Sequence, residues 1–218
     1  MLGRCIGAGL FALLLISMLP AVNADDSQQS SNLLTDGVSS NGYVCDPDGC
    51  STNDGTDWWR IYAYQGDIVS IAFSGSMNNA AWWCPGDGWE ADYSMHDETG
   101  SQVASMAKDN NNPSGTLSKT MPQAGNVYVK IKGKNSWCND GLDYTLLASI
   151  DKTARDTDED GFVDAEDDCD LIVGSSTNDR KGCIDSDSDG WSDTDSGWDV
   201  QNGADAFEND GTQWRDRD

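Results

Sequence analysis

Apolar and polar residues alternate over short stretches between residues 57 and 150. The clearest case is Asn126–Lys132, where Val127, Val129 and Ile131 alternate with Tyr128, Lys130 and Lys132. A period of two is typical of a β-strand with one buried face. The pattern therefore predicts strands at Trp58–Tyr64, Ile68–Ser74, Tyr93–Asp97, Val103–Ala107, Thr116–Met121, Asn126–Lys132 and Asp143–Ile150.

Turn-forming residues separate these predicted strands. Gln65-Gly66-Asp67 follows the first strand, and Glu98-Thr99-Gly100-Ser101 separates the third from the fourth. Short strands at this spacing, without a convincing helical stretch, favour an antiparallel β-sandwich over residues 57–150. About 94 residues are enough for one such core.

The chain before this domain has a different composition. Residues 25–56 are rich in Ser, Asn, Asp and Gly, which indicates a flexible leader ending in a small disulfide loop. Residues 1–24 combine Arg4, an apolar stretch over 6–19 and a small-residue site at Val22-Asn23-Ala24, the pattern of a secretory signal peptide. An uncleaved membrane anchor is the alternative, but the apolar stretch is short for a span and is interrupted by Pro20. We expect an extracellular or cell-surface protein that meets the membrane only through its signal peptide.

Six cysteines remain once the signal peptide, which carries Cys5, is removed. An even number in an exported chain predicts disulfides, although sequence alone does not choose among the possible pairings. We favour two local pairs and, by elimination, one that links distant parts of the sandwich. These pairs are Cys45 with Cys50, Cys169 with Cys183, and Cys84 with Cys138. A zinc site is disfavoured because His96 is the sole histidine and no CxxC pair occurs.

Negative charge is concentrated at the C-terminal end. The chain has a formal net charge of -25, and residues 151–218 hold 22 acidic and 6 basic side chains, which gives -16. This segment is poor in Leu, Ile and Val, so it cannot bury enough apolar surface to offset its conformational entropy. It is therefore either disordered or held by metal ions and disulfides. A nucleic-acid partner is excluded because phosphates would be repelled.

One acidic stretch, Asp156–Cys169, has the spacing of an EF-hand-type calcium loop. Alternate residues in such a loop direct oxygens at one ion, and Gly161 at position six permits the sharp turn. Calcium takes six to eight oxygen ligands, so a carboxylate at every second residue suits it. The carboxylates at positions one, three, five, nine and twelve are Asp156, Asp158, Asp160, Asp164 and Asp167.

The same pattern recurs at Asp185–Asp193, again with a glycine in register, at Gly190. Position twelve of this second loop is Ser196 rather than an acid, so Asp195 or Asp199 would have to substitute. A further copy begins at Asp216. Two copies with the glycine in register make calcium the expected cofactor. A solvated acidic surface is the plainer alternative.

The order of five short segments resembles that of pre-peptidase C-terminal domains. These segments are Asp57–Tyr62, Gly66–Ile71, Asp92–Gly100, Ala124–Ile131 and Asp143–Leu146. The resemblance implies a jelly-roll-like β-sandwich of the kind appended to secreted enzymes and surface proteins, usually without catalytic activity. The insert Met77–Glu90, which carries Trp82, Trp83 and Trp89, departs from the usual compact pattern.

The acidic segment resembles thrombospondin type 3 repeats. Asp156–Cys169, Asn178–Cys183 and Asp185–Asp193 carry the likeness. The resemblance implies calcium ions wrapped by a disulfide-tied chain with almost no regular secondary structure. It adds the carbonyls of Phe162 and Trp191 as ligands at position seven. In the second loop the matching carboxylates are Asp185, Asp187, Asp189 and Asp193.

These features indicate a non-enzymatic calcium-binding protein, in which an adhesion or accessory domain precedes a calcium-stiffened stalk. Its further partner would be an extracellular protein or a glycan. Catalysis has little support, because no GxSxG sequence accompanies His96 and no phosphate-binding glycine loop occurs. Two alternatives are the targeting fragment of a secreted peptidase or other hydrolase, and a carbohydrate-binding module that uses the Trp82–Trp89 insert.

Overall fold

The computed structural model describes residues 27–44, 55–78, 89–134 and 141–216. Within these ranges the regular elements are one 3₁₀ helix and nine strands. They are η1 (Gln28–Ser30), β1 (Asn32–Leu33), β2 (Ser39–Val44), β3 (Thr56–Ala63), β4 (Ile68–Asn78), β5 (Glu90–His96), β6 (Gln102–Asp109), β7 (Ser114–Thr120), β8 (Gly125–Lys134) and β9 (Gly141–Asp151). No helix long and apolar enough to cross a bilayer occurs in this described part of the chain.

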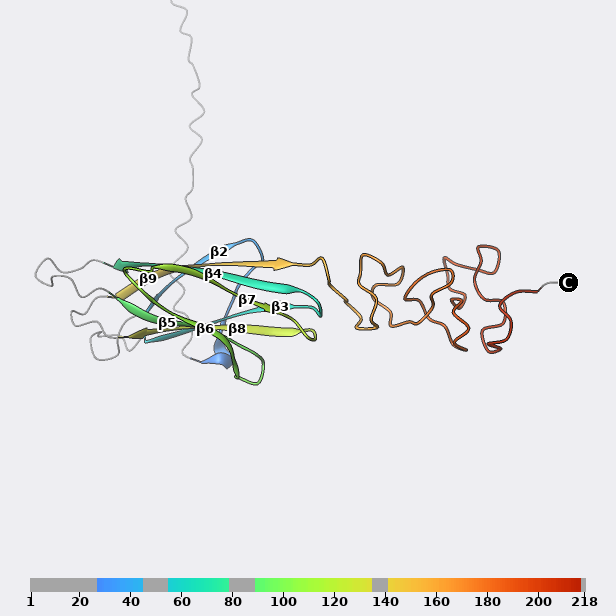
Figure 1. Ribbon diagram of the computed structural model, residues 1–218, viewed down its shortest axis with the longest axis horizontal. Helices are drawn as coiled ribbons and strands as arrows, with labels where there is room; N and C mark the ends of the chain where they lie inside the picture. Colours follow the sequence, from blue (N-terminus) through green and yellow to red (C-terminus); the bar gives the residue numbers. More distant parts are fainter. Residues whose placement is uncertain (1–26, 45–54, 79–88, 135–140, 217–218) are drawn as a thin grey trace, which may run out of the picture.

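The strands form two sheets that face each other as a sandwich (Figure 1). One sheet has five strands in the order β1-β3-β8-β5-β6, and the other has four in the order β2-β9-β4-β7. Neighbouring strands are antiparallel except for β1 and β3, which run parallel. Strands β3 to β9 correspond to the seven strands that the alternating pattern predicts, so the mainly β sandwich is confirmed.

An aromatic cluster lies between the two sheets. The ring of Phe73 from β4 stacks on Tyr93 from β5 and Tyr144 from β9, and Trp89 meets it edge-on. The Tyr93 hydroxyl donates to the Ile71 carbonyl in the opposite sheet over 2.5 Å. Trp59 Nε1 likewise donates across the sandwich to the Tyr144 hydroxyl over 2.8 Å. These bonds satisfy the polar atoms of large buried rings, as close packing requires.

The expectation of a flexible leader over 25–56 is wrong for the part that the structure describes. Strand β1 adds to the edge of one sheet beside β3, and β2 adds to the edge of the other beside β9. Leu34 and Val44 are buried in the core. Edge strands need few apolar side chains, because backbone hydrogen bonds to a single neighbour hold them. Composition alone therefore gave no signal for them.

Several predicted features fall outside the described residues. These are the signal peptide, most of the Trp82–Trp89 insert, and the cysteines Cys45, Cys50, Cys84 and Cys138. The two disulfides assigned to these cysteines stay predictions. Trp89 itself is described, and it packs in the sandwich core.

The acidic segment continues directly from β9 and extends away from the sandwich (Figure 1). Arg155 holds the junction: its Nε and Nη2 donate to the two carboxylate oxygens of Asp67 over 3.0 and 2.9 Å. Asp67 is fully buried in the β3–β4 turn, and the Arg155 guanidinium lies 4.5 Å from the centre of the Tyr64 ring. The Asp156 amide also donates to the Gln65 carbonyl. A bidentate pair with a buried carboxylate fixes both position and direction.

Gly66 allows the close approach of this junction. It has a φ of 79°, and a Cβ atom there would lie 1.5 Å from the Ala154 carbonyl oxygen. Gly37 has a similar φ of 73° but open space around it. Gly37→Ala should lower the free energy of unfolding by about 1 kcal/mol through backbone strain alone. Gly66→Ala should cost roughly 2–4 kcal/mol and also displace residues 152–156, because strain and overpacking add.

Urea unfolding of both variants, with limited proteolysis at the junction, checks this prediction. Equal losses of stability and equal cleavage rates would contradict the proposed role of Gly66.

Candidate metal centres

The described chain from 157 to 216 contains turns and bends but no helix or strand. Its order comes from hydrogen bonds between aspartate side chains and backbone amides. Such bonds satisfy amides that would otherwise pair in secondary structure. Two loops within this segment bring carboxylates close together.

The first loop gathers Asp156, Asp158 and Asp160, and one oxygen from each lies within 4.8 Å of the other two. The Asp156 carboxylate accepts from the amides of Glu159 and Gly161, which have φ values of 66° and 102°. These left-handed residues wrap the chain around the carboxylates. The glycine fits this conformation without a steric penalty.

The second loop repeats this geometry 29 residues later, counted from Asp156 to Asp185. Asp185, Asp187 and Asp189 form the corresponding group within 4.8 Å. Asp185 accepts from the amides of Ser188 and Gly190, whose φ values are 65° and 93°. Asp187 and Asp189 each accept from the amide two residues on, as Asp158 and Asp160 do. Two separate loops therefore adopt one hydrogen-bonding pattern.

Both loops contain buried carboxylate oxygens without a hydrogen-bond partner. They are Oδ2 of Asp158 in the first loop and Oδ2 of Asp187 in the second. A buried oxygen that no donor satisfies costs free energy unless a cation meets it. Burial, together with the charges of Asp160 and Asp156, raises the pKa of Asp158. The carboxylates are thus held in a place that disfavours their charge without a positive partner.

Asp167, the predicted ligand at position twelve of the first loop, lies outside the group of three close carboxylates. Burial and the nearby charges of Asp160 and Asp158 raise the pKa of this carboxyl. Gly182 lies against it, because a Cβ at that glycine would come within 2.2 Å of Asp167 Oδ1.

Asp205 is a further buried carboxylate that the sequence spacing did not single out. It is 1% exposed, and its Oδ2 is buried without a hydrogen-bond partner. Burial and the charges of Asp189, Asp187 and Asp193 raise the pKa of Asp205. Asp205 Oδ1 accepts from the amide of Phe207, two residues on, as Asp167 accepts from Cys169. This shared hydrogen bond makes Asp205 the candidate counterpart of Asp167 at the second group.

The two substitutes suggested by sequence, Asp195 and Asp199, have other roles. Asp195 accepts from Arg180 Nη1 over 2.7 Å, and Asp199 accepts from the amides of Gln201 and Asn202. The only sequence signal for Asp205 is that it is the single acidic residue in the otherwise apolar stretch Ala204–Phe207. No fixed spacing relates it to Asp185, because the intervening chain loops away and returns.

The remaining predicted ligands lie in the loops but outside the two close groups. Asp164 accepts from the amide and hydroxyl of Thr157, and Asp193 accepts in the same way from Ser186. Each carboxylate therefore bonds the second residue of its own loop, which joins the two ends of the loop. Phe162 and Trp191 donate their amides to Asp160 and Asp189. Coordination through their carbonyls stays a prediction.

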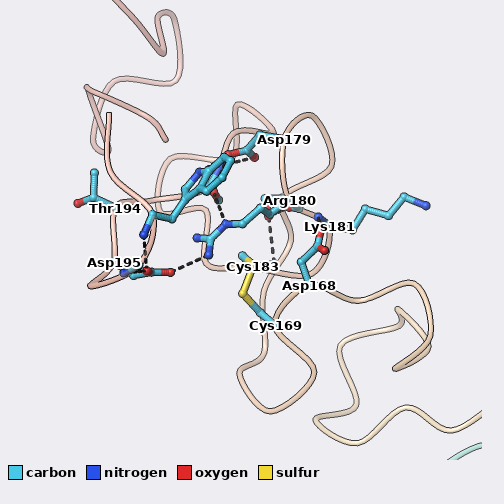
Figure 2. A network of polar contacts seen from close by, with 12 residues as sticks. Asp168, Cys169, Asp179, Arg180, Lys181, Cys183, Thr194 and Asp195 are labelled. Carbon is cyan, nitrogen blue, oxygen red and sulfur yellow. Dashed lines mark hydrogen bonds and ion pairs between the residues drawn. A yellow bond between two sulfur atoms is a disulfide. The ribbon is translucent and has the colours of Figure 1, made fainter. Parts of the chain in front are cut away.

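A disulfide and an arginine network connect the two loops (Figure 2). Cys169 is bonded to Cys183, the local pair that the sequence favoured. Arg180 pairs with Asp195 and lies 5.2 Å from the centre of the Trp198 ring. Burial alone would raise the pKa of Asp179, but hydrogen bonds from Ser192, from the backbone and from Trp198 outweigh it and lower that pKa.

Stacked tryptophans lie further along the same segment. The rings of Trp191 and Trp214 are 3.7 Å apart at an angle of 10°. This contact brings the end of the described chain back to the second loop.

Comparison with known proteins leaves the family open. No protein-family model matches the chain, and no curated protein matches it. Among solved structures, the pre-peptidase C-terminal domain of a collagenase from Bacillus anthracis is 14% identical, with a TM-score of 0.37 over 54% of this chain and 93% of that chain. PliG, a periplasmic inhibitor of g-type lysozyme from Aeromonas hydrophila, is 9% identical, with a TM-score of 0.32 over 55% and 95%.

A CBM4 structure is 13% identical, with a TM-score of 0.34 over 54% of this chain and 74% of that one. Similarities of this size carry no argument about function. The resemblance of the acidic segment to thrombospondin type 3 repeats remains a prediction.

The assignment of Asp205 to the second group gives a specific prediction. Asp205→Asn should weaken cation binding at that group by about tenfold or more, because it removes a buried charged ligand. Asp199→Asn removes the same charge from an exposed turn and should change the affinity by no more than about twofold. Calcium titration calorimetry on both variants measures the difference. If Asp199→Asn weakens binding as much as Asp205→Asn, the assignment fails.

Proposed function

We propose that this chain is an exported calcium-binding protein, in which a non-catalytic β-sandwich is attached to an acidic segment that calcium holds in shape. The observation that carries the proposal is the pair of matching carboxylate groups with buried, unpartnered oxygens at Asp158, Asp187 and Asp205. A cation at each group would satisfy these oxygens and cancel the repulsion between the carboxylates.

The donor set favours calcium over other biological metals. The grouped side chains are all aspartates, so the donors are hard oxygens without nitrogen or sulfur. Zinc and copper sites normally include histidine or cysteine. Magnesium demands a small octahedral shell and keeps several waters, whereas calcium accepts many protein oxygens in a flexible loop.

Each residue would have a defined part in the first site. Asp156, Asp158, Asp160 and Asp167 would supply carboxylate oxygens, and the amides of Glu159 and Gly161 orient Asp156. The second site would use Asp185, Asp187, Asp189 and Asp205. Calcium supplies positive charge there and no chemistry beyond binding. We expect dissociation constants of about 10⁻⁴–10⁻³ M, the range of extracellular modules.

The cellular role follows from this arrangement. Millimolar affinity fits a calcium-rich exterior, and the disulfide between Cys169 and Cys183 fits an oxidising compartment. With calcium bound, the acidic segment would act as a stiff stalk that Arg155 and Asp67 join to the sandwich. The sandwich would then serve as an adhesion or accessory module held at a fixed distance and direction.

Calcium removal gives the direct prediction of this proposal. The acidic segment should lose its order in chelator, whereas the sandwich, with its own apolar core, should stay folded. At free calcium a hundredfold above the dissociation constant, each site adds about 2.7 kcal/mol to stability. Limited proteolysis with mass spectrometry should therefore show faster cleavage between residues 156 and 200 in chelator, with the strands β3 to β9 protected throughout.

Magnesium at equal concentration is the control for ionic strength, and it should protect the segment much less. Cleavage at the same rate with calcium and with chelator would show that calcium does not organise the acidic segment.

A further inference from the structure

The outer face of the five-stranded sheet carries a regular set of cations and aromatic rings. Strands β3 and β8 alternate buried and outward residues, and the buried ones form the core. The cross-strand register places Trp58 opposite Lys130, and Arg60 opposite Tyr128. Each of these two neighbouring cross-strand pairs thus consists of one aromatic ring and one cation. We call Trp58, Arg60, Tyr128, Lys130, Lys132 and Lys134 the lysine–aromatic face.

This face concentrates positive charge in a strongly acidic protein. Four of the six Lys and Arg residues between 25 and 150 lie on it, although this region has 16 acidic residues and a net charge of -10. Three lysines follow one another along β8, which lies between β3 and β5 in the middle of the sheet. Outward residues of a strand are about 6.8 Å apart, so the lysines form an evenly spaced row.

The other sheet provides a contrast. The outward side chains of its strands β4 and β7 are mainly hydroxyls, and Ser70 bonds Ser118 over 2.8 Å. Lysine on the outer face is therefore not a general feature of this sandwich. Solubility alone does not account for the cations, because a chain with a net charge of -25 is already strongly charged.

Two acidic residues of β5 face these cations across the sheet, because the register places Asp92 opposite Lys132 and Glu90 opposite Lys134. Lys134 pairs with Asp92 over 2.6 Å, but both side chains are more than 40% exposed, where such pairs contribute little. The Lys130 ammonium lies 5.1 Å from the centre of the Trp58 ring. Both hydrogen bonds that Arg60 makes, to the carbonyl and hydroxyl of Ser31, use Nη1 alone. The exposed Lys132 has no ion pair among the described residues.

One ring of this face, Trp58, packs against His96 of β5, which lies on the same side of the sheet. Trp58 lies 5.0 Å from the His96 ring at a tilt of 56°. His96 is 8% exposed, its Nε2 bonds the Ser94 hydroxyl and its Nδ1 bonds the Gly100 carbonyl. These two hydrogen bonds fix the His96 ring, and the His96 ring in turn restricts the orientation of Trp58. A half-buried ring with a fixed orientation loses little entropy when a ligand covers it.

We propose that the lysine–aromatic face binds an anionic polysaccharide. The ammonium and guanidinium groups would meet its carboxylate or sulfate groups through charge-assisted hydrogen bonds. The rings of Trp58 and Tyr128 would cover the apolar faces of its sugar units. An acidic polypeptide would satisfy the cations but not the rings. A nucleic acid would place phosphates against the same cations, and its binding is an outcome that the test distinguishes.

The test is calorimetric titration of the full chain with short oligomers, with and without calcium. The probes are hexagalacturonate for carboxylated sugars, a carrageenan hexasaccharide for sulfated sugars, neutral maltohexaose, hexaglutamate and a single-stranded hexanucleotide. We expect one or both anionic sugars to bind, and the difference between them identifies the preferred anionic group. We expect weaker binding of the other three probes.

Two matched double variants locate the site. K130Q/K132Q removes two charges from the face and should weaken anionic-sugar binding by about tenfold or more. K119Q/K152Q removes two charges elsewhere and should leave the affinity within about twofold. Tyr128→Val, which keeps a good strand former at an outward position, should weaken sugar binding but not binding of hexaglutamate. Thermal unfolding confirms that each variant is folded.

Four results would overturn the proposal. They are no binding of either anionic sugar, equal binding of maltohexaose, equal loss of affinity in the two double variants, and binding of hexaglutamate or the oligonucleotide as tight as that of the best sugar. The last result would identify a general polyanion surface. None of these results depends on calcium, so they leave the proposed stalk unaffected.

Discussion

The close approach of three aspartates in each acidic loop is the constraint on which the C-terminal third of the protein depends. One oxygen from each lies within 4.8 Å of the other two, in a segment without helix, strand or apolar core. Backbone amides hold the outer oxygens, while Oδ2 of Asp158 and Oδ2 of Asp187 stay buried and unpartnered. Carboxylates at this separation repel one another, so the proposed cations at these two points would stabilise the fold of the segment. A divalent cation supplies positive charge without adding bulk.

The connections between the loops and the sandwich follow from the same constraint. Asp156 accepts two amides within its loop, and its own amide donates to Gln65 in the sandwich. The neighbouring Arg155 is fixed by the buried Asp67. A cation at the first loop would therefore also stiffen the junction. Between the loops, the Cys169–Cys183 disulfide and the ion pair of Arg180 with Asp195 connect the first loop to the second. The lysine–aromatic face lies on the sandwich, which has its own core and does not need the metal.

Sequence predicted most of this fold, because alternation over β3 to β9 reports burial on one face directly. It missed β1 and β2, since edge strands are held by backbone bonds that leave little mark on composition. The calcium-loop spacing predicted both groups of three carboxylates, because the residues of each group are close in sequence. It could not single out Asp205, whose burial and electrostatic interaction with Asp187 and Asp189 depend on the path of the intervening chain. The lysine–aromatic face depends on the register between β3 and β8, which alternation within one strand does not reveal.

The most direct test of the central claim is a crystal structure of the protein grown with calcium, with anomalous difference density measured at long wavelength. The account predicts two peaks. One lies about 2.3–2.6 Å from carboxylate oxygens of Asp156, Asp158 and Asp160. The other lies at the same distance from those of Asp185, Asp187 and Asp205. Absence of both peaks, with the buried oxygens satisfied by lysine, arginine or water instead, would contradict it.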